Sequence, residues 1–270
     1  LLNVIIFGTK VRASLLNNLL NHYYRSKMRR EWRFSKFPPH FEDNFSVLKL
    51  WPITKNPDFL NRGLFNREVM DKESTVLNIG CGDGLYDSLF YSSVAKNIDA
   101  VDIDKSAIKF AKKNNSSENI TFYELDCINK EFPKKSYDVV VLDGAIGHFN
   151  ENDINMILSK IKNVIGNNGI FVGSEELSTP DMMPWDHFQA FPDLIDLKSL
   201  LQKFFPFVKT KEISPINDRY REGFFRCSLN RKVIEKYVWV FAGAAQRHAG
   251  TGRVLHGISQ PGSAKTLIFG

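Results

Sequence analysis

Three glycines alternate with other residues in the segment VLNIGCGDGLYD, residues 76–87, directly after an apolar run. Gly80, Gly82 and Gly84 allow close approach to the backbone at a point where the chain is expected to turn from a strand into a helix. A helix N-terminus presents free backbone N–H groups and the positive end of the helix dipole. The segment is therefore suited to bind a negatively charged group such as a phosphate or a carboxylate, although a tight turn alone would also explain it.

Five short runs rich in Val, Ile, Phe and Tyr follow one another from residue 74 onward, and they indicate the elements that position this loop. The predicted strands are residues 75–80, 97–103, 119–126, 137–144 and 169–176. A later run at residues 221–229 predicts one more strand.

Amphipathic segments separate several of these strands. Residues 105–114 predict a helix with Asp104 as its N-cap. Residues 150–166 place apolar side chains on one helical face, with Asn150 as the N-cap and Gly166 as the end. Because strands and helices alternate, a mainly parallel sheet with both faces covered is expected.

A further helical region is expected at residues 185–204, with Pro192 near the start of its main part. Ligands of open parallel sheets bind outside the carboxyl ends of the strands. Chemically active side chains are therefore sought in the loops that follow each strand.

The glycine spacing departs from the dinucleotide fingerprint G-x-G-x-x-G, because the sixth position is Leu85. The spacing G-x-G-x-G, followed by the acidic residue Asp102 at the end of the next strand, resembles the class I S-adenosylmethionine-dependent methyltransferases. This resemblance runs from residue 74 to 176, with a looser extension to 229. It implies a Rossmann-like three-layer α/β sandwich with a seven-stranded, mainly parallel sheet. It also implies S-adenosylmethionine as cofactor and S-adenosylhomocysteine as product.

The resemblance implies roles for individual residues. Asp102 matches the acidic residue that accepts hydrogen bonds from both ribose hydroxyls, and Ile103 can pack on the adenine. Asp126 and Cys127 fall where the family contacts the adenine edge. Asn78 stands where the family usually has an acid, so a negative charge is removed near the cofactor. The expected cofactor-binding residues are Asn78, Gly80, Cys81, Gly82, Gly84, Asp102, Ile103, Asp126, Cys127, Asp143 and Gly144.

Methyl transfer is an in-line displacement, so the protein mainly aligns the reactants and excludes water. An acceptor that carries a proton also needs a base within hydrogen-bond reach. His148, a few residues after the fourth strand, is expected to be that base or to close over the cofactor. Glu175 and Glu176 are the alternative bases, unless they are ordinary structural carboxylates. Asp143, Asp186 and His187 are further candidates, although Asp186 and His187 are preferably interpreted as the start of a helix.

Changes of composition suggest three parts of the chain. Residues 1–73 are expected to form an N-terminal addition, with a basic helix around residues 15–33 and an aromatic, Pro-rich connection that could act as a lid. Residues 74–230 are expected to form the methyltransferase domain. Residues 231–270 lack Asn and Asp and show little periodicity, so we expect a poorly ordered or non-native tail there.

Charge is distributed unevenly, with net values of +6 for residues 1–75, −5 for 76–230 and +5 for 231–270. An anionic partner would meet the ends, although solvated surface charge explains the same pattern. The expected acceptor is an oxygen or nitrogen of a small molecule, a lipid-linked intermediate or a glycan. The alternatives are an RNA or protein methyltransferase that uses the basic ends, and an inactive cofactor-binding partner subunit.

Other classes of site receive little support from the sequence. Cys81, Cys127 and Cys227 form no C-x-x-C pair, so neither a disulfide framework nor a zinc site is indicated. The acidic residues are too scattered to suggest a metal site. The apolar opening LLNVIIFG is too short to span a bilayer, and no targeting segment is recognised. A cytoplasmic location is expected, and the oligomeric state is left open.

Overall fold

The computed structural model describes residues 60–213 and 221–237, together with six separate residues nearer the N-terminus, which are Leu19, His22, Tyr23, Ser26, Arg30 and Arg33. All of these six except Arg33 are helical, in agreement with the predicted basic helix. The remainder of the predicted addition before residue 60, including the proposed lid, lies outside the described residues. So do residues 238–270 of the predicted tail.

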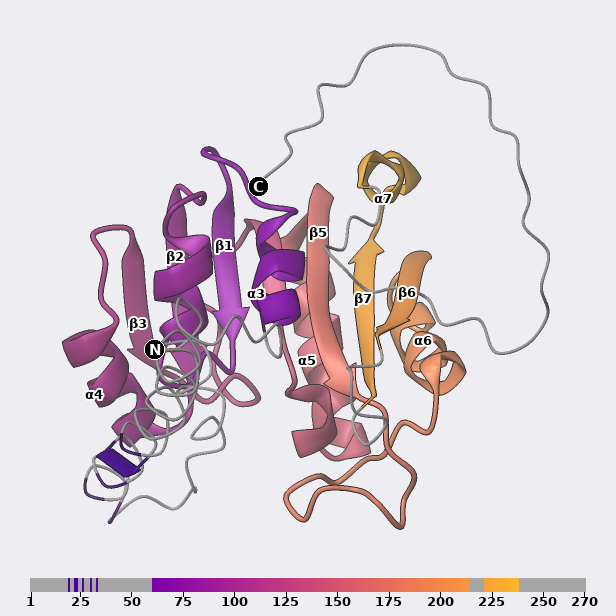
Figure 1. The fold of residues 1–270 in the computed structure, drawn as a ribbon. Coiled ribbons are helices and arrows are strands. Elements are labelled where there is room, and N and C mark those ends of the chain that lie inside the picture. The colour runs from indigo at the N-terminus through magenta and orange to yellow at the C-terminus, as the bar shows by residue number, and fades with distance from the viewer. Residues whose placement is uncertain are drawn as a thin grey trace, which may run out of the picture.

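A seven-stranded sheet forms the centre of the described structure (Figure 1). Its strands are β1 (Thr75–Ile79), β2 (Asn97–Asp102), β3 (Ile120–Glu124), β4 (Tyr137–Leu142), β5 (Ile165–Glu176), β6 (Phe207–Ile213) and β7 (Glu222–Ser228). Their order is β3-β2-β1-β4-β5-β7-β6. The first five in that order are parallel, and β7 is antiparallel to both of its neighbours.

Helices cover both faces of this sheet. They are α3 (Leu60–Arg67), α4 (Lys105–Asn114), α5 (Glu151–Val164), α6 (Leu194–Gln202) and α7 (Arg231–Lys236), with a π-helical segment η1 (Asp87–Tyr91) and a 3-10 turn η2 (Ile146–His148). Buried side chains of α3, η1, α4 and α7 pack on one face, and those of α5 and α6 pack on the other. The predicted three-layer, Rossmann-like sandwich with a mainly parallel sheet is thus confirmed.

The local signals at two helices were largely correct. Asp104 caps α4 by accepting from the backbone N–H of Ser106, and Asn150 caps α5 by accepting from that of Asp153. The predicted end of α5 at Gly166 is wrong. The backbone already becomes extended at Ile165, which pairs with β4, so Gly166 belongs to β5.

The predicted helical region at residues 185–204 is correct only in its second half. Asp193 accepts hydrogen bonds from the N–H groups of Ile195 and Asp196, and this cap starts α6 at Leu194. The segment before it forms turns and an isolated bridge at Phe191. The interpretation of Asp186 and His187 as a helix start is therefore wrong.

The structured core extends beyond both predicted borders of the methyltransferase domain. Phe65, Val69 and Met70, from the predicted addition, are buried in the core of the sheet face that carries α3. Ile234 of α7, from the predicted tail, is buried in the same core. None of the helices in the described part of the chain has the length and apolar character that crossing a bilayer requires.

Candidate active site

The glycine loop connects β1 to the helical turn before η1, at the carboxyl edge of the parallel strands (Figure 1). Gly80, Gly82 and Gly84 have φ angles of 70°, 55° and 70°, a region that residues with a Cβ rarely adopt. The N–H groups of Gly80 and Cys81 both donate to the carbonyl of Val101, at 2.9 and 3.1 Å. The loop is therefore fastened to β2 by its own backbone.

Asp102 ends β2 and joins this loop through its side chain. Oδ2 accepts from the N–H of Gly82 and Oδ1 accepts from the N–H of Asp104, each at 2.8 Å. Burial raises the pKa of Asp102 to about 6, although these two hydrogen bonds oppose the shift. Above that pH the carboxylate is charged, and its remaining lone pairs can accept from a diol.

The residues expected near an adenine ring differ in what they already bind. Ile103 follows Asp102 and is 49% exposed, so it offers an apolar surface at this edge. Asp126 instead binds its own turn, because its oxygens accept from the N–H groups of Ile128 and Asn129 and from the Asn129 amide. Cys127 is partly buried, and burial raises the pKa of its thiol to about 12. Of these three, Ile103 presents the most accessible surface.

Asn78 lies beneath the loop and faces a carboxyl group that the motif did not reveal. Its amide nitrogen donates to both oxygens of Asp87, each at 3.0 Å. Asp87 is fully buried, and burial raises its pKa to about 7. An acid at position 78 would place two buried carboxyl groups in contact, so the amide is the residue type that suits this partner.

Asp143 and Gly144, at the end of β4, lie under the guanidinium of Arg62 from α3. Arg62 Nε is 3.1 Å from Asp143 Oδ2 and 3.3 Å from Glu222 Oε1. The Ser174 hydroxyl bridges the two acids, at 2.6 Å from Asp143 Oδ1 and 2.5 Å from Glu222 Oε1. A hydroxyl has one proton, so one contact requires a protonated carboxyl, and burial raises the pKa of Glu222 to about 7. Sequence reasoning missed Arg62, Ser174 and Glu222, since none belongs to a recognisable motif.

The second half of the site begins at η2, the turn after β4. Glu175 is fully buried in β5 and accepts a 2.8 Å hydrogen bond from the N–H of Ile146, so it holds this turn in place. Burial raises the pKa of Glu175 to about 8. Glu176 is partly exposed, and burial followed by the charge of Asp186 raises its pKa.

The loop between β5 and α6 docks on the same turn through its backbone. The N–H groups of Phe188 and Gln189 donate to the carbonyl of Gly147, at 2.7 and 3.3 Å. The Gln189 amide donates to the carbonyl of Phe149 at 2.6 Å. These bonds fix a loop that has no regular secondary structure against the turn that carries His148.

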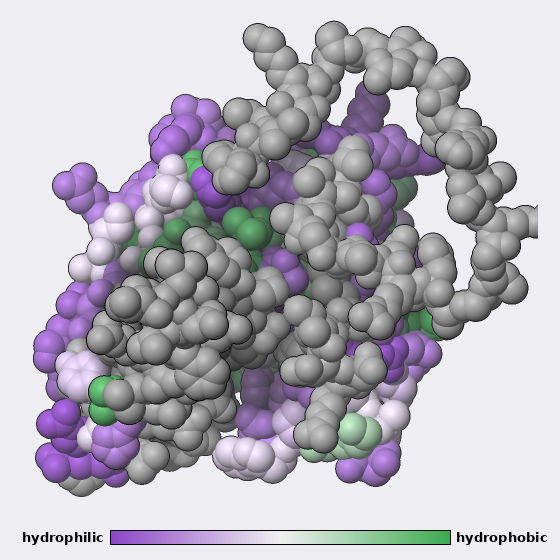
Figure 2. Space-filling view, viewed as in Figure 1, coloured by the Kyte–Doolittle hydropathy of each residue, from purple (hydrophilic) through white to green (hydrophobic). Residues whose placement is uncertain are grey.

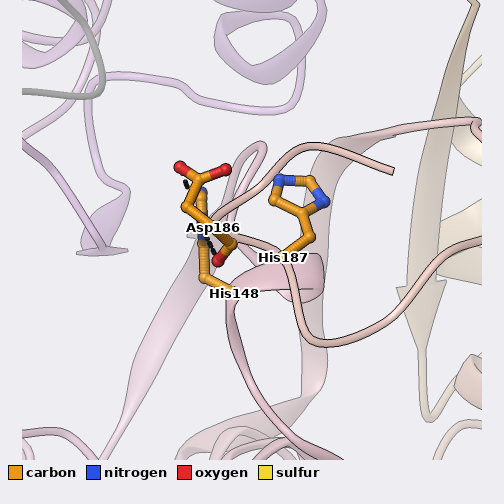
Figure 3. Close-up of side chains that lie close together, drawn as sticks. All are labelled: His148, Asp186 and His187. Atoms are coloured by element: carbon orange, nitrogen blue, oxygen red, sulfur yellow. Dashed lines mark hydrogen bonds and ion pairs between the residues drawn. The ribbon is translucent and has the colours of Figure 1, made fainter. Parts of the chain in front are cut away.

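This docking brings His148, Asp186 and His187 side by side (Figure 3). His148 Nδ1 is 3.2 Å from the Asp186 carbonyl oxygen and 3.8 Å from its Oδ2. The two imidazole rings meet edge to face, with centroids 4.5 Å apart. A side chain at Gly147 would fall 2.3 Å from His187 Nδ1, so the close approach depends on this glycine. The sequence predicted no metal site, yet these three donor groups lie within 4.8 Å of one another.

Exposed apolar side chains are concentrated on the same loop. Met182, Trp185 and Phe188 are 68%, 81% and 70% exposed. White and pale-green residues lie along the lower edge of Figure 2, where Figure 1 places this loop, among hydrophilic neighbours. The loop therefore offers an apolar contact surface beside the histidine cluster.

A family model described as "Methyltransferase domain" matches residues 76–169. Uncharacterized methyltransferases of Mycobacterium bovis and Mycobacterium tuberculosis are 29% identical to this chain over 90 residues. The aligned region is 33% of this chain and 44% of theirs, less than half the length of these curated relatives.

Solved structures resemble a larger part of the chain. The DhpI–SAH complex, at 14% identity and a TM-score of 0.53, covers 78% of this chain and 95% of its own. A TehB-like SAM-dependent methyltransferase from Corynebacterium glutamicum, also at 14% identity, has a TM-score of 0.51 and covers 71% of this chain and 99% of its own. The [4+2]-cyclase SpnF, at 14% identity, has a TM-score of 0.52 and covers 65% of this chain and 83% of its own. At such low identities the likeness concerns the fold, and the cyclase shows that the fold alone does not fix the reaction.

Proposed function

We propose that this chain is a class I S-adenosylmethionine-dependent methyltransferase that methylates an oxygen or nitrogen of a small molecule, a lipid-linked intermediate or a glycan, in keeping with the match of residues 76–169 to the "Methyltransferase domain" model. One observation carries the proposal. The loop joined to Asp102 and the turn that bears His148 lie at the same carboxyl edge of adjacent strands β1 and β4. A cofactor held by the loop would therefore extend toward the histidine.

The cofactor side fits S-adenosylmethionine. Gly80 has a positive φ, and a Cβ there would make only an ordinary van der Waals contact, 3.5 Å from Ala145 Cβ, so no atom crowds this side of the loop. We assign the ribose hydroxyls to Asp102 and one adenine face to Ile103. When bound, the cofactor supplies a methyl group: the acceptor lone pair forms the new bond to carbon while the carbon–sulfur bond breaks and its electron pair stays on sulfur.

The acceptor side is assigned to the turn after β4 and the loop after β5. His148 Nδ1 lies at hydrogen-bond distance from the Asp186 carbonyl, which suits a tautomer with the proton on Nδ1 and the lone pair on Nε2. In that tautomer Nε2 can take the proton that the acceptor loses. Glu175 is a positioning residue in this scheme, because it is fully buried and holds Ile146. Glu176, which is partly exposed, is the alternative base.

The exposed apolar residues of the β5–α6 loop favour an acceptor with an apolar part. Met182 and Phe188 flank the histidine cluster in the sequence, and both present most of their surface to solvent. A wholly hydrophilic acceptor would gain no favourable contact with this apolar surface. This loop favours such an acceptor over RNA or protein, which would rely on the basic ends of the chain.

The proposal is tested by calorimetry with S-adenosylmethionine and S-adenosylhomocysteine, followed by transfer of a labelled methyl group to separated acceptor pools. We expect saturable binding of both compounds and label in small molecules, lipid-linked intermediates or glycans. Label in RNA, with activity that falls steeply with salt, would instead indicate a nucleic-acid acceptor. Binding without label in any pool would favour the cofactor-binding subunit, an outcome that the cyclase with the same fold makes worth measuring.

A further inference from the structure

Two histidines and one carboxylate meet at the carboxyl ends of β4 and β5, outside the residues assigned to the cofactor. The donor groups of His148, Asp186 and His187 all lie within 4.8 Å of one another (Figure 3). In the part of the chain that the structure describes, no other group of at least three His, Cys, Asp or Glu side chains is arranged in this way. We propose that this cluster binds one divalent first-row transition-metal ion, with Zn²⁺ as the ion that suits it best.

The surroundings of both imidazole rings support this assignment. Histidines that bind metals usually donate their second ring N–H to a carboxylate or a backbone carbonyl, which fixes the tautomer. His187 Nδ1 lies 3.8 Å from Glu175 Oε1, a buried oxygen without a hydrogen-bond partner. His148 Nδ1 lies 3.2 Å from the Asp186 carbonyl oxygen. His148 Nδ1 thus has an acceptor within hydrogen-bond distance, so Nε2 is the atom of that ring suited to the ion.

The spacing requires only a small contraction. Donors in a tetrahedral zinc site lie about 3.4 Å apart, given Zn–N bonds of about 2.0–2.1 Å. Ligand atoms of the three residues, one from each, lie within 4.8 Å of one another, so the farthest pair would have to approach by up to about 1.4 Å. Asp186 and His187 lie in a loop without regular structure, anchored at Gly147 by backbone bonds from the two residues that follow. Small side-chain and loop adjustments can supply this contraction.

The ligand types determine which ions fit. Two imidazoles and one carboxylate suit Zn²⁺ and its first-row neighbours, whereas Mg²⁺ and Ca²⁺ prefer oxygen ligands alone. Three protein ligands also leave a coordination position open, as in catalytic zinc sites. The sequence concealed this set, since His148 and the Asp186–His187 pair are 38 residues apart at their shortest separation.

The role of the ion in catalysis rests on the proposed function. An ion between the two loops would border the space assigned to the acceptor, where its charge would favour the deprotonated form of an acceptor hydroxyl. His148 would then act through the ion rather than as a free base. The binding itself can be measured without turnover, so the two proposals can fail separately.

The test uses the full chain, stripped with a chelator and titrated with Zn²⁺ by calorimetry, with Co²⁺ visible absorption as a report on coordination. We expect one equivalent to bind, and we expect Mg²⁺ not to compete. His187→Ala and Asp186→Asn should each weaken Zn²⁺ binding at least about 100-fold, since even outer-shell changes cost 10- to 100-fold. Asp181→Asn is the matched control, because Asp181 is an exposed carboxylate of the same loop outside the cluster.

Binding of S-adenosylhomocysteine, measured on the same samples, keeps the two proposals apart and shows that each variant is folded. It should be unaffected by Asp186→Asn. Absence of one-to-one Zn²⁺ binding by the wild-type chain would overturn the metal site. So would equal affinity in the wild type, His187→Ala and Asp186→Asn, because the ion would then bind elsewhere.

Discussion

The two halves of the active site are built in different ways. The proposed cofactor half is made of neighbouring segments, with a loop whose backbone bonds to the next strand at Val101 and Asp102 and to the end of the helix that follows at Asn115. The acceptor half joins segments that are distant in sequence, such as the turn at Ile146 and Glu175 of β5. The first is specified by local backbone geometry, and the second depends on how distant loops dock.

The two halves also use different kinds of side chain. The proposed cofactor side consists mainly of glycines and one carboxylate, Asp102, so the backbone would supply much of its binding surface. The acceptor side relies on two imidazole rings and on a buried acid that holds a turn. Changes on the acceptor side should therefore affect turnover, and changes on the cofactor side should affect folding and cofactor affinity.

The largest expected effect is on turnover at His148. His148→Ala should lower turnover about 100- to 10,000-fold, the usual range for loss of a general base, with little change in cofactor affinity. Steady-state kinetics and calorimetry on the same variant measure both quantities. Asp181→Asn, on the neighbouring loop, should leave both unchanged. Weakened cofactor binding with normal turnover at saturation would move His148 to the cofactor half.

A pair of glycines tests how far the loop depends on local packing. Gly80 and Gly84 share a φ of +70°, but a Cβ at Gly84 would clash with the ring of Phe122, whereas one at Gly80 would lie 3.5 Å from Ala145 Cβ, an ordinary van der Waals distance. Gly84→Ala should lower the free energy of unfolding by roughly 2–5 kcal/mol, through backbone strain and overpacking together. Gly80→Ala should cost only the strain, about 1–2 kcal/mol. Equal losses in denaturant unfolding would contradict this packing.

The same contrast explains what the sequence could predict. The mainly parallel sheet and the caps at Asp104 and Asn150 follow from local patterns, and the structure confirms them. The start of β5 at Ile165 was missed by four residues. The partner of Asn78 could not be predicted. No local rule brings the carboxyl group of Asp87 into contact with a residue nine positions earlier in the chain. The cluster of His148, Asp186 and His187 was missed for a related reason, since it depends on backbone bonds to Gly147 in a loop that lacks periodicity.

The strand β6 illustrates a further limit of the sequence. Residues Phe207–Ile213 alternate polar and apolar side chains only weakly, and their assignment depends on pairing with β7. The seventh strand was expected from the family resemblance, but its residues could not be located. Edge strands are stabilised by one neighbour, so their own sequence need not carry a strong pattern.

A smaller effect concerns stability and the buried pair beneath the cofactor loop. The folded-state pKa of Asp87 is raised to about 7, so folding favours its protonated form. Its stabilising contribution is present below the usual value of 3.8 and is lost as pH rises through about 7. Asp87→Asn removes this loss and should gain on the order of 4 kcal/mol relative to wild type between pH 4 and pH 8. Denaturant unfolding at the two pH values measures it, and a difference independent of pH would show that Asp87 is ionised in the fold.

The most direct test of the central claim is calorimetry of S-adenosylhomocysteine with the wild-type chain and Asp102→Ala. If Asp102 holds the ribose of the cofactor, its loss should weaken binding by about 1–3 kcal/mol, the cost of leaving buried hydrogen-bond partners unmade. Glu118→Ala, an exposed acid before β3, should leave the affinity unchanged. An unchanged dissociation constant in folded Asp102→Ala would contradict the assignment of this edge of the sheet to S-adenosylmethionine.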